Sequence, residues 1–194
     1  MDQYIEFIGT IVGLIYLLLE YRASIYMWLV GIIMPAIYIY IYYSAGLYAN
    51  FGINIYYLLA AIYGYLSWRG LLGKTGQDES FSITRTPKRG WCIATAMYLV
   101  TQTFITWLLI NYTDSTTPIM DAFTTALSIV GMWMLARGYI EQWWIWCVVD
   151  LASSALYWHT GLHFTAGLYL VYAIVAVFGY MKWKSMINNE HVEG

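Results

Sequence analysis

Seven long apolar segments dominate the sequence and set its fold class. They cover residues 4–19, 24–43, 50–68, 91–110, 119–136, 140–158 and 164–181. Only 10% of the residues are charged and 61% are hydrophobic, whereas a water-soluble domain carries about 25% charged residues. So few charges cannot cover a surface that faces water, and about 20 apolar residues are enough for a helix to cross a bilayer. The pattern predicts an all-α integral membrane protein with seven transmembrane helices.

The nine lysine and arginine residues support this number of helices. Arg22 lies in the first connection, Arg137 in the fifth and five more in the third, residues 69–90, while Lys182 and Lys184 follow the seventh helix. The N-terminus and the other three connections carry none. Because cytoplasmic loops are rich in Lys and Arg, we expect an inner-membrane protein with its N-terminus outside, and with the loop 69–90 and the C-terminus in the cytoplasm.

The two ends of the chain are similar at a constant offset of 115 positions (143 − 28). The identical residues include glycines, tryptophans and arginines, for example Arg22 and Arg137, Trp28 and Trp143, Tyr57 and Tyr172, Gly64 and Gly179, and Trp68 and Trp183. Residues 4–68 and 119–183 are therefore expected to be three-helix repeats within a single transmembrane domain, 1–194. The linker helix 91–110 restores the starting side, so the repeats run in parallel. Transporters with parallel repeats bind their substrates near the midplane, between the repeats.

Asp150 lies deep inside the sixth apolar segment. An ionisable side chain at that depth is costly and by default marks a functional site. At about 100° per residue, Trp143 and Trp146 lie on the same helix face as Asp150, and Ser154 and Tyr157 continue that face. Aromatic rings attract organic cations, so these five residues predict a binding site for a flat cation. The alternative for Asp150 is a structural carboxyl group, either bonded to a neighbouring helix or kept protonated by its burial. The alternative for the tryptophans is a place at the lipid interface.

Five further positions are candidates for the site or for a gate. Asn54 and Tyr57 share a face of the third helix, and Gln102 lies in the fourth. Each side chain would hydrogen-bond either a ligand or a neighbouring helix. Pro35 is the repeat-mate of the buried aspartate, and it either frees a backbone carbonyl for a substrate or kinks a gating helix. Glu20 lies at the cytoplasmic mouth, where it is either a gate or a solvated loop residue.

The sequence argues against several other classes of protein. A net charge of −2 gives no sign of a nucleic-acid partner. The three histidines have no carboxylate or cysteine at ligand spacing, so neither a metal nor a cofactor is predicted. An intramembrane enzyme would need paired acids, a metal cluster or a Ser/His couple at the midplane. A seven-helix retinal receptor would need a lysine inside the last helix. A transporter for a small molecule in the lipid bilayer is favoured over both.

The sequence also resembles a known family. The parallel three-plus-one-plus-three layout occurs together with Trp143-x-x-Trp146-x-x-x-Asp150, Glu20-Tyr21-Arg22-Ala23-Ser24 and Gly31-Ile32-Ile33-Met34-Pro35. These features resemble the PnuC family of vitamin transporters over essentially the whole chain. The resemblance implies a SWEET-like fold, a homotrimer, and facilitated diffusion of nicotinamide riboside that a cytosolic kinase traps after entry.

One position departs from the pattern of that family. Members that carry nicotinamide riboside typically have Asn where this chain has Asp150, and a related subgroup carries thiamine. Both vitamins are flat aromatic cations, and a carboxylate attracts either one. The resemblance therefore leaves nicotinamide riboside and thiamine open as substrates.

Overall fold

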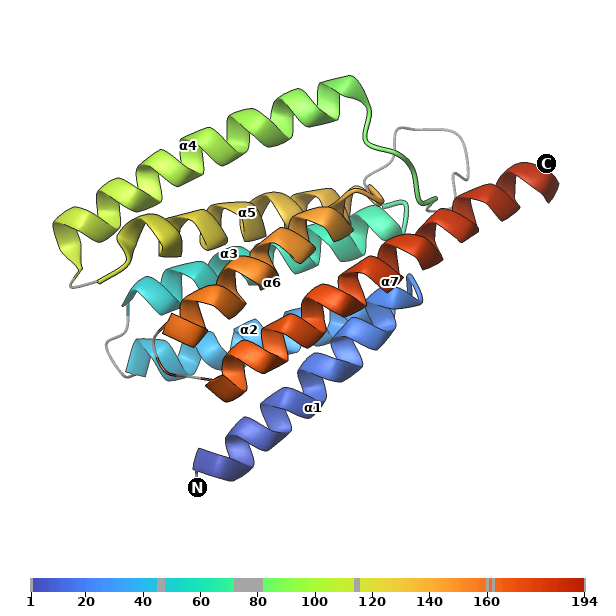
Figure 1. The fold of residues 1–194 in the computed structure, drawn as a ribbon. Helices are drawn as coiled ribbons and strands as arrows, with labels where there is room; N and C mark the ends of the chain where they lie inside the picture. Colours follow the sequence, from blue (N-terminus) through green and yellow to red (C-terminus); the bar gives the residue numbers. More distant parts are fainter. Residues whose placement is uncertain are drawn as a thin grey trace. The chain divides into compact units, whose positions relative to one another are not determined.

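Seven α-helices make up the described part of the protein. The structure is a computed structural model that describes residues 2–44, 48–71, 82–113, 116–159, 161 and 163–193. In chain order (Figure 1) the helices are α1 (Asp2–Tyr21), α2 (Tyr26–Ser44), α3 (Tyr48–Trp68), α4 (Lys88–Tyr112), α5 (Pro118–Ala136), α6 (Gln142–His159) and α7 (His163–Glu193). The number and order of the predicted helices are confirmed. Of the predicted loop 69–90, residues 72–81 lie outside the described residues, and the last three residues belong to α4.

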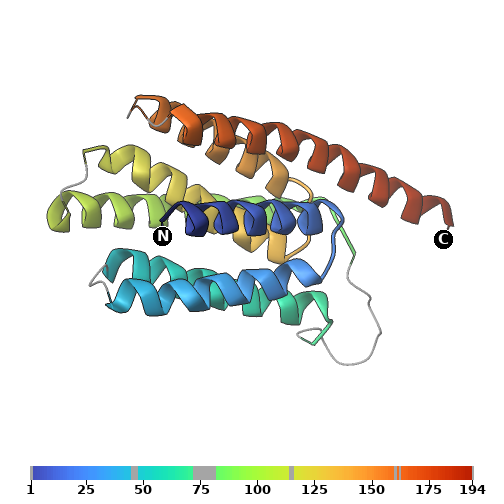
Figure 2. The same cartoon turned by 90° about the horizontal axis from the view of Figure 1, so that it is seen from below.

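The last helix is longer than expected. The sequence predicted that the apolar segment ends at Met181 and that a polar tail follows, but α7 continues to Glu193. The tail contains neither proline nor glycine before its last residue, and residues such as lysine, methionine and glutamate favour helix. Polarity therefore ends the apolar segment but not the helix, and Figure 2 shows α7 running well past α6 toward the C-terminus.

Three of the described helices are long and apolar enough to cross a membrane: α4, α5 and the part of α7 up to Asn188. Shorter apolar stretches lie in α1 and α2, at Ile11–Tyr21 and Tyr26–Tyr40. Many large apolar side chains on these helices are exposed, as expected where lipid is the solvent. The helices thus have the composition of a multi-pass membrane protein.

The chain divides into two compact units, Met1–Ser82 and Ile83–Gly194. In the first unit α1 packs on α2, and α2 packs on α3. In the second unit α4 packs on α5, α5 on α6, and α6 on α7. The pairs α2–α3 and α6–α7 are antiparallel neighbours (Figure 2).

A tryptophan fixes the α2–α3 pair of the first unit. Trp28 of α2 is fully buried, and its ring lies directly on the backbone of α3 at Gly64. A Cβ atom added to Gly64 would stand only 2.3 Å from the Trp28 ring. The same ring meets the edge of Trp68 at a centroid distance of 5.5 Å and an interplanar angle of 82°. Only glycine lets the indole approach α3 this closely.

The α6–α7 pair of the second unit has the same arrangement. Trp143 of α6 is 1% exposed, and a Cβ atom on Gly179 of α7 would stand 2.7 Å from its ring. The ring meets Trp183 edge-on at 5.6 Å and 88°. These three residues stand at the offset of 115 from those of the first unit (143 − 28), so residues matched in the sequence also make matching contacts.

The turn between α1 and α2 and the turn between α5 and α6 are also alike. Ala23 has a positive φ of 50° and its mate Gly138 a φ of 70°. Around them the backbone bonds Arg22 N to Leu18 O, Ala23 N to Glu20 O and Ser24 N to Leu19 O are matched by Arg137 N to Trp133 O, Gly138 N to Leu135 O and Tyr139 N to Met134 O. All six N···O distances lie between 2.9 and 3.2 Å.

The second of these turns also holds the chain segment that precedes α4. Thr84 N donates to Gly138 O at 2.9 Å, and Ile140 N donates to Thr84 O at 3.0 Å. The Glu141 carboxylate accepts the Thr86 backbone N–H at 2.8 Å and the Thr86 hydroxyl at 2.7 Å. Residues 83–87 are thus tied to the α5–α6 turn by four hydrogen bonds.

Candidate functional site

The buried acid of α6 is the centre of the candidate site. Asp150 lies in the middle of α6, and its side chain is 8% exposed. No donor within the part of the chain that the structure describes bonds or pairs with its carboxylate. A buried charge without a partner destabilises the folded protein by roughly 3–5 kcal/mol unless something neutralises it. The carboxylate is therefore poised to accept a donor or a cation from outside its own helix.

Trp146 lies one helical turn before Asp150 and packs on α5. A Cβ atom on Gly131 would stand 3.2 Å from the Trp146 ring and 3.3 Å from Ile145 Cγ2. The glycine therefore allows the indole to lie against the α5 backbone. Its Nε1–H is buried and meets no acceptor among the described residues. Because a buried indole N–H usually finds a hydrogen-bond partner, this donor is available to a ligand.

Tyrosines of α7 complete the site on the other side of α6. The Tyr157 ring lies 5.2 Å from that of Tyr169, which in turn lies 5.8 Å from Tyr172. Tyr169 and Tyr172 both interact electrostatically with Asp150. The Ser154 hydroxyl donates to the Ala166 carbonyl at 2.8 Å and thus ties α6 to α7.

The sequence did not single out these two α7 tyrosines. Tyr172 is the repeat-mate of Tyr57 (172 − 57 = 115), which was a candidate on its own. Applying the same offset to each candidate would have found Tyr172. Tyr169 carries no such signal, because its proximity to Asp150 depends on how α7 packs on α6.

Trp143 takes a different position from Trp146, although the two were expected to line one face. Its ring packs on Gly179 and Trp183 of α7, whereas the Trp146 ring packs on α5. With 1% of its surface exposed, Trp143 contacts protein on nearly all sides. In this structure it joins two helices and so fixes the orientation of α6, on which Asp150 stands.

The remaining candidates of the first unit are spread over its three helices. Glu20 is 2% exposed at the end of α1. Pro35 is buried inside α2, which continues through it to Ser44. Asn54 and Tyr57 of α3 are half-buried, and the Tyr57 ring lies 5.7 Å from that of Tyr56. A buried acid thus lies in each unit.

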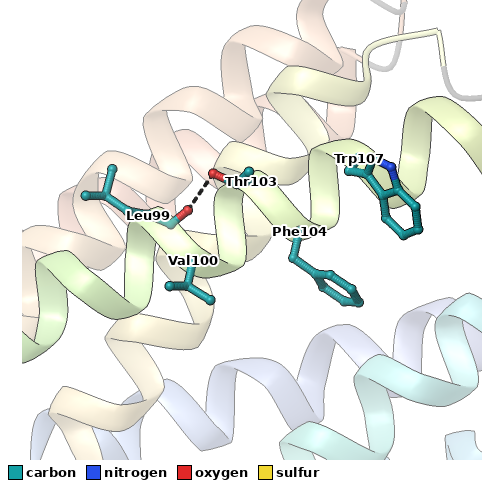
Figure 3. Close-up of a pocket in the computed structure, with 5 residues that line it drawn as sticks. All are labelled: Leu99, Val100, Thr103, Phe104 and Trp107. Atoms are coloured by element: carbon teal, nitrogen blue, oxygen red, sulfur yellow. Dashed lines mark hydrogen bonds between the residues drawn. The ribbon is translucent and has the colours of Figure 1, made fainter.

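Gln102 belongs to the interface of α4 with α5. Its Nε2 donates to Thr106 Oγ1 at 3.1 Å and to the Ile119 carbonyl at 3.4 Å, while its buried Oε1 meets no donor among the described residues. Close by, α4 carries a shallow hollow lined by Leu99, Val100, Thr103, Phe104 and Trp107 (Figure 3). The Thr103 hydroxyl donates to the Leu99 carbonyl at 2.8 Å. The hollow therefore presents apolar surface and no charge.

The chemistry of the site is that of binding. Among the residues that the structure describes, no group of three or more His, Cys, Asp or Glu side chains is placed to hold a metal ion. What the second unit brings together is the buried Asp150 carboxylate, the Trp146 indole donor one turn before it and a set of aromatic rings. The Nε1–H of Trp143 is also buried without an acceptor among the described residues. Rings attract cations through their faces, and the carboxylate supplies the countercharge.

Comparisons with known proteins agree on one family. The family model for the nicotinamide mononucleotide transporter matches residues 3–185. The riboflavin/roseoflavin transporter RibM of Streptomyces davaonensis is 29% identical over 94% of this chain and 86% of its own length. The nicotinamide riboside transporter PnuC of Neisseria mucosa is 26% identical over 96% of this chain and 74% of its own. The crystal structure of the vitamin B3 transporter PnuC superimposes with a TM-score of 0.66 at 25% identity, covering 92% of this chain and 79% of that one.

Proposed function

Because the chain belongs to the nicotinamide mononucleotide transporter family, we propose that it carries nicotinamide riboside across the cytoplasmic membrane by facilitated diffusion. The family and its solved relative are transporters, and no enzymatic role is proposed. The substrate would bind at Asp150, with Trp146 and the tyrosines of α6 and α7 around its ring. Trp143 would position α6, and Ser154 would hold it against α7.

The observation that carries this proposal is the Asp150 carboxylate, which is buried and has no hydrogen-bond or ion-pair partner among the described residues. In a membrane-spanning helix such a charge is retained for a function. A pyridinium ring beside the carboxylate would offset the cost of burying the charge. The unpartnered Trp146 Nε1–H would donate to an oxygen of the ligand. Among the described residues, the Asp150 carboxylate and the Trp146 Nε1–H thus both lack a hydrogen-bond partner, and they lie one turn apart on α6.

The charge of the site favours a cation among the substrates for which the relatives are named. RibM is named for riboflavin and PnuC for nicotinamide riboside. Riboflavin is neutral and gains nothing from a carboxylate beyond a hydrogen bond, whereas nicotinamide riboside is a cation. Thiamine is the second candidate, because it is also a flat cation and its aminopyrimidine would donate to the Asp150 carboxylate.

The architecture proposed for transport uses the matched contacts of the two units. The equal turns and the equal Trp–Gly–Trp contacts support two parallel three-helix repeats joined by α4. The proposed orientation puts the N-terminus outside and the basic connections in the cytoplasm, as the positive-inside rule requires. Asn54, Tyr57, Gln102 and Pro35 would act from the first repeat and the linker. A homotrimer and a cytosolic kinase that traps the vitamin complete the proposal.

The decisive experiment is calorimetric titration of the purified protein with nicotinamide riboside, thiamine and riboflavin. We expect the two cations to bind more tightly than riboflavin. In Asp150→Ala their affinity should fall by about tenfold or more, the effect of losing one close charge interaction. Asp121→Ala removes a carboxylate from the first turn of α5 and serves as the control, with unchanged affinity. Equal affinity of wild type and Asp150→Ala for both cations would refute the site.

Proteoliposomes test the passive mechanism. Facilitated diffusion predicts that labelled vitamin equilibrates across the membrane without a proton gradient, and that it accumulates only when a kinase and ATP are enclosed. Uptake that an uncoupler abolishes in vesicles without kinase would contradict this mechanism while leaving the binding site intact.

A further inference from the structure

The first unit also contains a buried acid that follows an aromatic residue on its helix. Glu20 of α1 is 2% exposed, and an aromatic residue, Tyr16, stands four positions before it. Trp146 stands four positions before Asp150 in the same way. On a helix, residues four apart lie on one face, one turn above the other. Each unit therefore has an aromatic ring and an acid stacked on one helix.

The ring of Tyr16 lies against a glycine of the neighbouring helix, as the ring of Trp146 does. A Cβ atom on Gly31 of α2 would stand 3.6 Å from Tyr16 Cε2, and one on Gly131 of α5 would stand 3.2 Å from the Trp146 ring. These four residues are two pairs at the offset of 115, with the large and small partners exchanged (131 − 16 and 146 − 31). One aromatic ring thus fills the same helix interface in each unit, but it comes from opposite helices.

A tyrosine of α3 or of α7 completes each cluster. Tyr57 of α3 interacts electrostatically with Tyr16, which also interacts with Glu20. In the second unit Tyr172 of α7 interacts with Asp150, and Tyr57 and Tyr172 are repeat-mates. Both units thus combine ring, acid and tyrosine hydroxyl, although a comparison of identical residues does not reveal this.

The ring comes from α1 in the first unit and from α6 in the second. For this reason the acid lies on a different side of the ring in each unit. The helices α1 and α2 are antiparallel, and so are α5 and α6. An acid four residues after the ring therefore lies on the side of the connecting turn in α1 and on the side away from it in α6. Glu20 lies toward the turn that follows α1, next to Tyr21, the last residue of α1. Asp150 lies away from the equivalent turn, in the middle of α6. Glu20 therefore lies at the end of α1 next to the connection that carries Arg22.

We propose that Tyr16, Glu20 and Tyr57, packed at Gly31, form a second binding station for the same flat aromatic cation, near the end of α1 that is expected to face the cytoplasm. This station rests on the proposed function, because it takes its ligand class from Asp150. Its ring would stack on the cation, and its carboxylate would draw the cation from the membrane interior toward the cytoplasm. Weaker binding than at Asp150 is expected, since a station near the exit must release its ligand.

Glu20→Gln and Glu20→Asp in the full-length protein test the station, with binding and transport measured separately. Calorimetry with nicotinamide riboside or thiamine should give an unchanged affinity at the Asp150 site in both variants. Counterflow of the labelled vitamin in proteoliposomes should slow by about tenfold in Glu20→Gln, the factor that corresponds to 1.4 kcal/mol. Glu20→Asp keeps the charge and should retain most of the rate.

Tyr16→Leu and Tyr16→Phe test the ring independently, in case Glu20→Gln lowers thermal stability. The leucine variant should slow counterflow, whereas the phenylalanine variant keeps the ring and should not. Wild-type counterflow in both Glu20→Gln and Tyr16→Leu would overturn the station. So would loss of all binding in a folded Glu20→Gln, because Glu20 would then belong to the main site. If Asp150→Ala binds like wild type, the proposed function fails instead, whatever the Glu20 variants do.

Discussion

The Trp143 indole lies on the backbone of Gly179, so close that a Cβ atom on the glycine would stand 2.7 Å from the ring. A real Cβ atom does not tolerate that distance, and the contact exists only because residue 179 has no side chain. The buried ring fills the space between α6 and α7. Since Asp150 stands on the same α6, the contact also sets the position of the candidate site relative to α7.

Gly179→Ala should therefore destabilise the protein. The added methyl group must push the ring or the helices apart, and overpacking of this kind costs about 1–3 kcal/mol. The measurement is the midpoint of thermal unfolding in detergent. Gly167→Ala, also on α7, is the matched control because an added Cβ there meets nothing within 4 Å. Equal midpoints for the two variants would show that the helices adjust freely around Trp143.

The two related turns predict opposite responses to exchanging alanine and glycine. Gly138 has a φ of 70° and Ala23 a φ of 50°, and an L-residue with a side chain is strained in this region by about 1–2 kcal/mol. Gly138→Ala should lower the unfolding midpoint, whereas Ala23→Gly should leave it unchanged or raise it. The two variants are each other's control. A loss of stability in Ala23→Gly would mean that this turn carries no strain.

The bond between Glu141 and Thr86 should keep the segment before α4 on the α5–α6 turn. The carboxylate accepts two hydrogen bonds from Thr86, at 2.8 and 2.7 Å, and a hydrogen bond to a charged group contributes about 1.5–3 kcal/mol. Glu141→Gln should loosen residues 83–87, so trypsin should cleave after the exposed Arg85 faster than in the wild type. Thr86→Ser keeps both donors and should be cleaved at the wild-type rate. Unchanged cleavage of Glu141→Gln would show that the backbone bonds of Thr84 suffice.

Much of the fold could be predicted because the signals are local in the chain. Apolar runs and the distribution of basic residues predicted seven helices. Trp28 and Trp143, which match at the offset of 115, make matching contacts in the two units. Helical periodicity also placed Trp143 and Trp146 on one face of α6. It could not tell which helix each ring would meet, because that choice depends on a glycine far along the chain, Gly179 or Gly131.

The other limit lies in comparing identical residues only. The pair Tyr16–Gly31 and the pair Gly131–Trp146 fill one kind of space with opposite partners, so neither position matches at the offset of 115 (131 − 16). Packing conserves the summed volume at an interface rather than the residue at each position. The buried Asp150 was found because a charge in an apolar run is visible by itself. Tyr169 was missed because it becomes relevant only when α7 lies against α6.

Gly131→Ala separates the role of the Trp146 ring in the site from its role in the fold. The added Cβ would stand 3.2–3.4 Å from Trp146 and Ile145 atoms, a distance that a small shift of a half-buried indole relieves. Stability should therefore change by about 1 kcal/mol or less, while the ring moves with respect to Asp150, one turn away. Because a cation bound at a ring depends on its distance from the ring face, calorimetry should show an affinity several-fold weaker. Gly167→Ala again provides the control, with both affinity and midpoint unchanged. If Gly131→Ala and Trp146→Leu both bind the ligand with wild-type affinity, this ring does not touch the ligand. The carboxylate alone would then define the site.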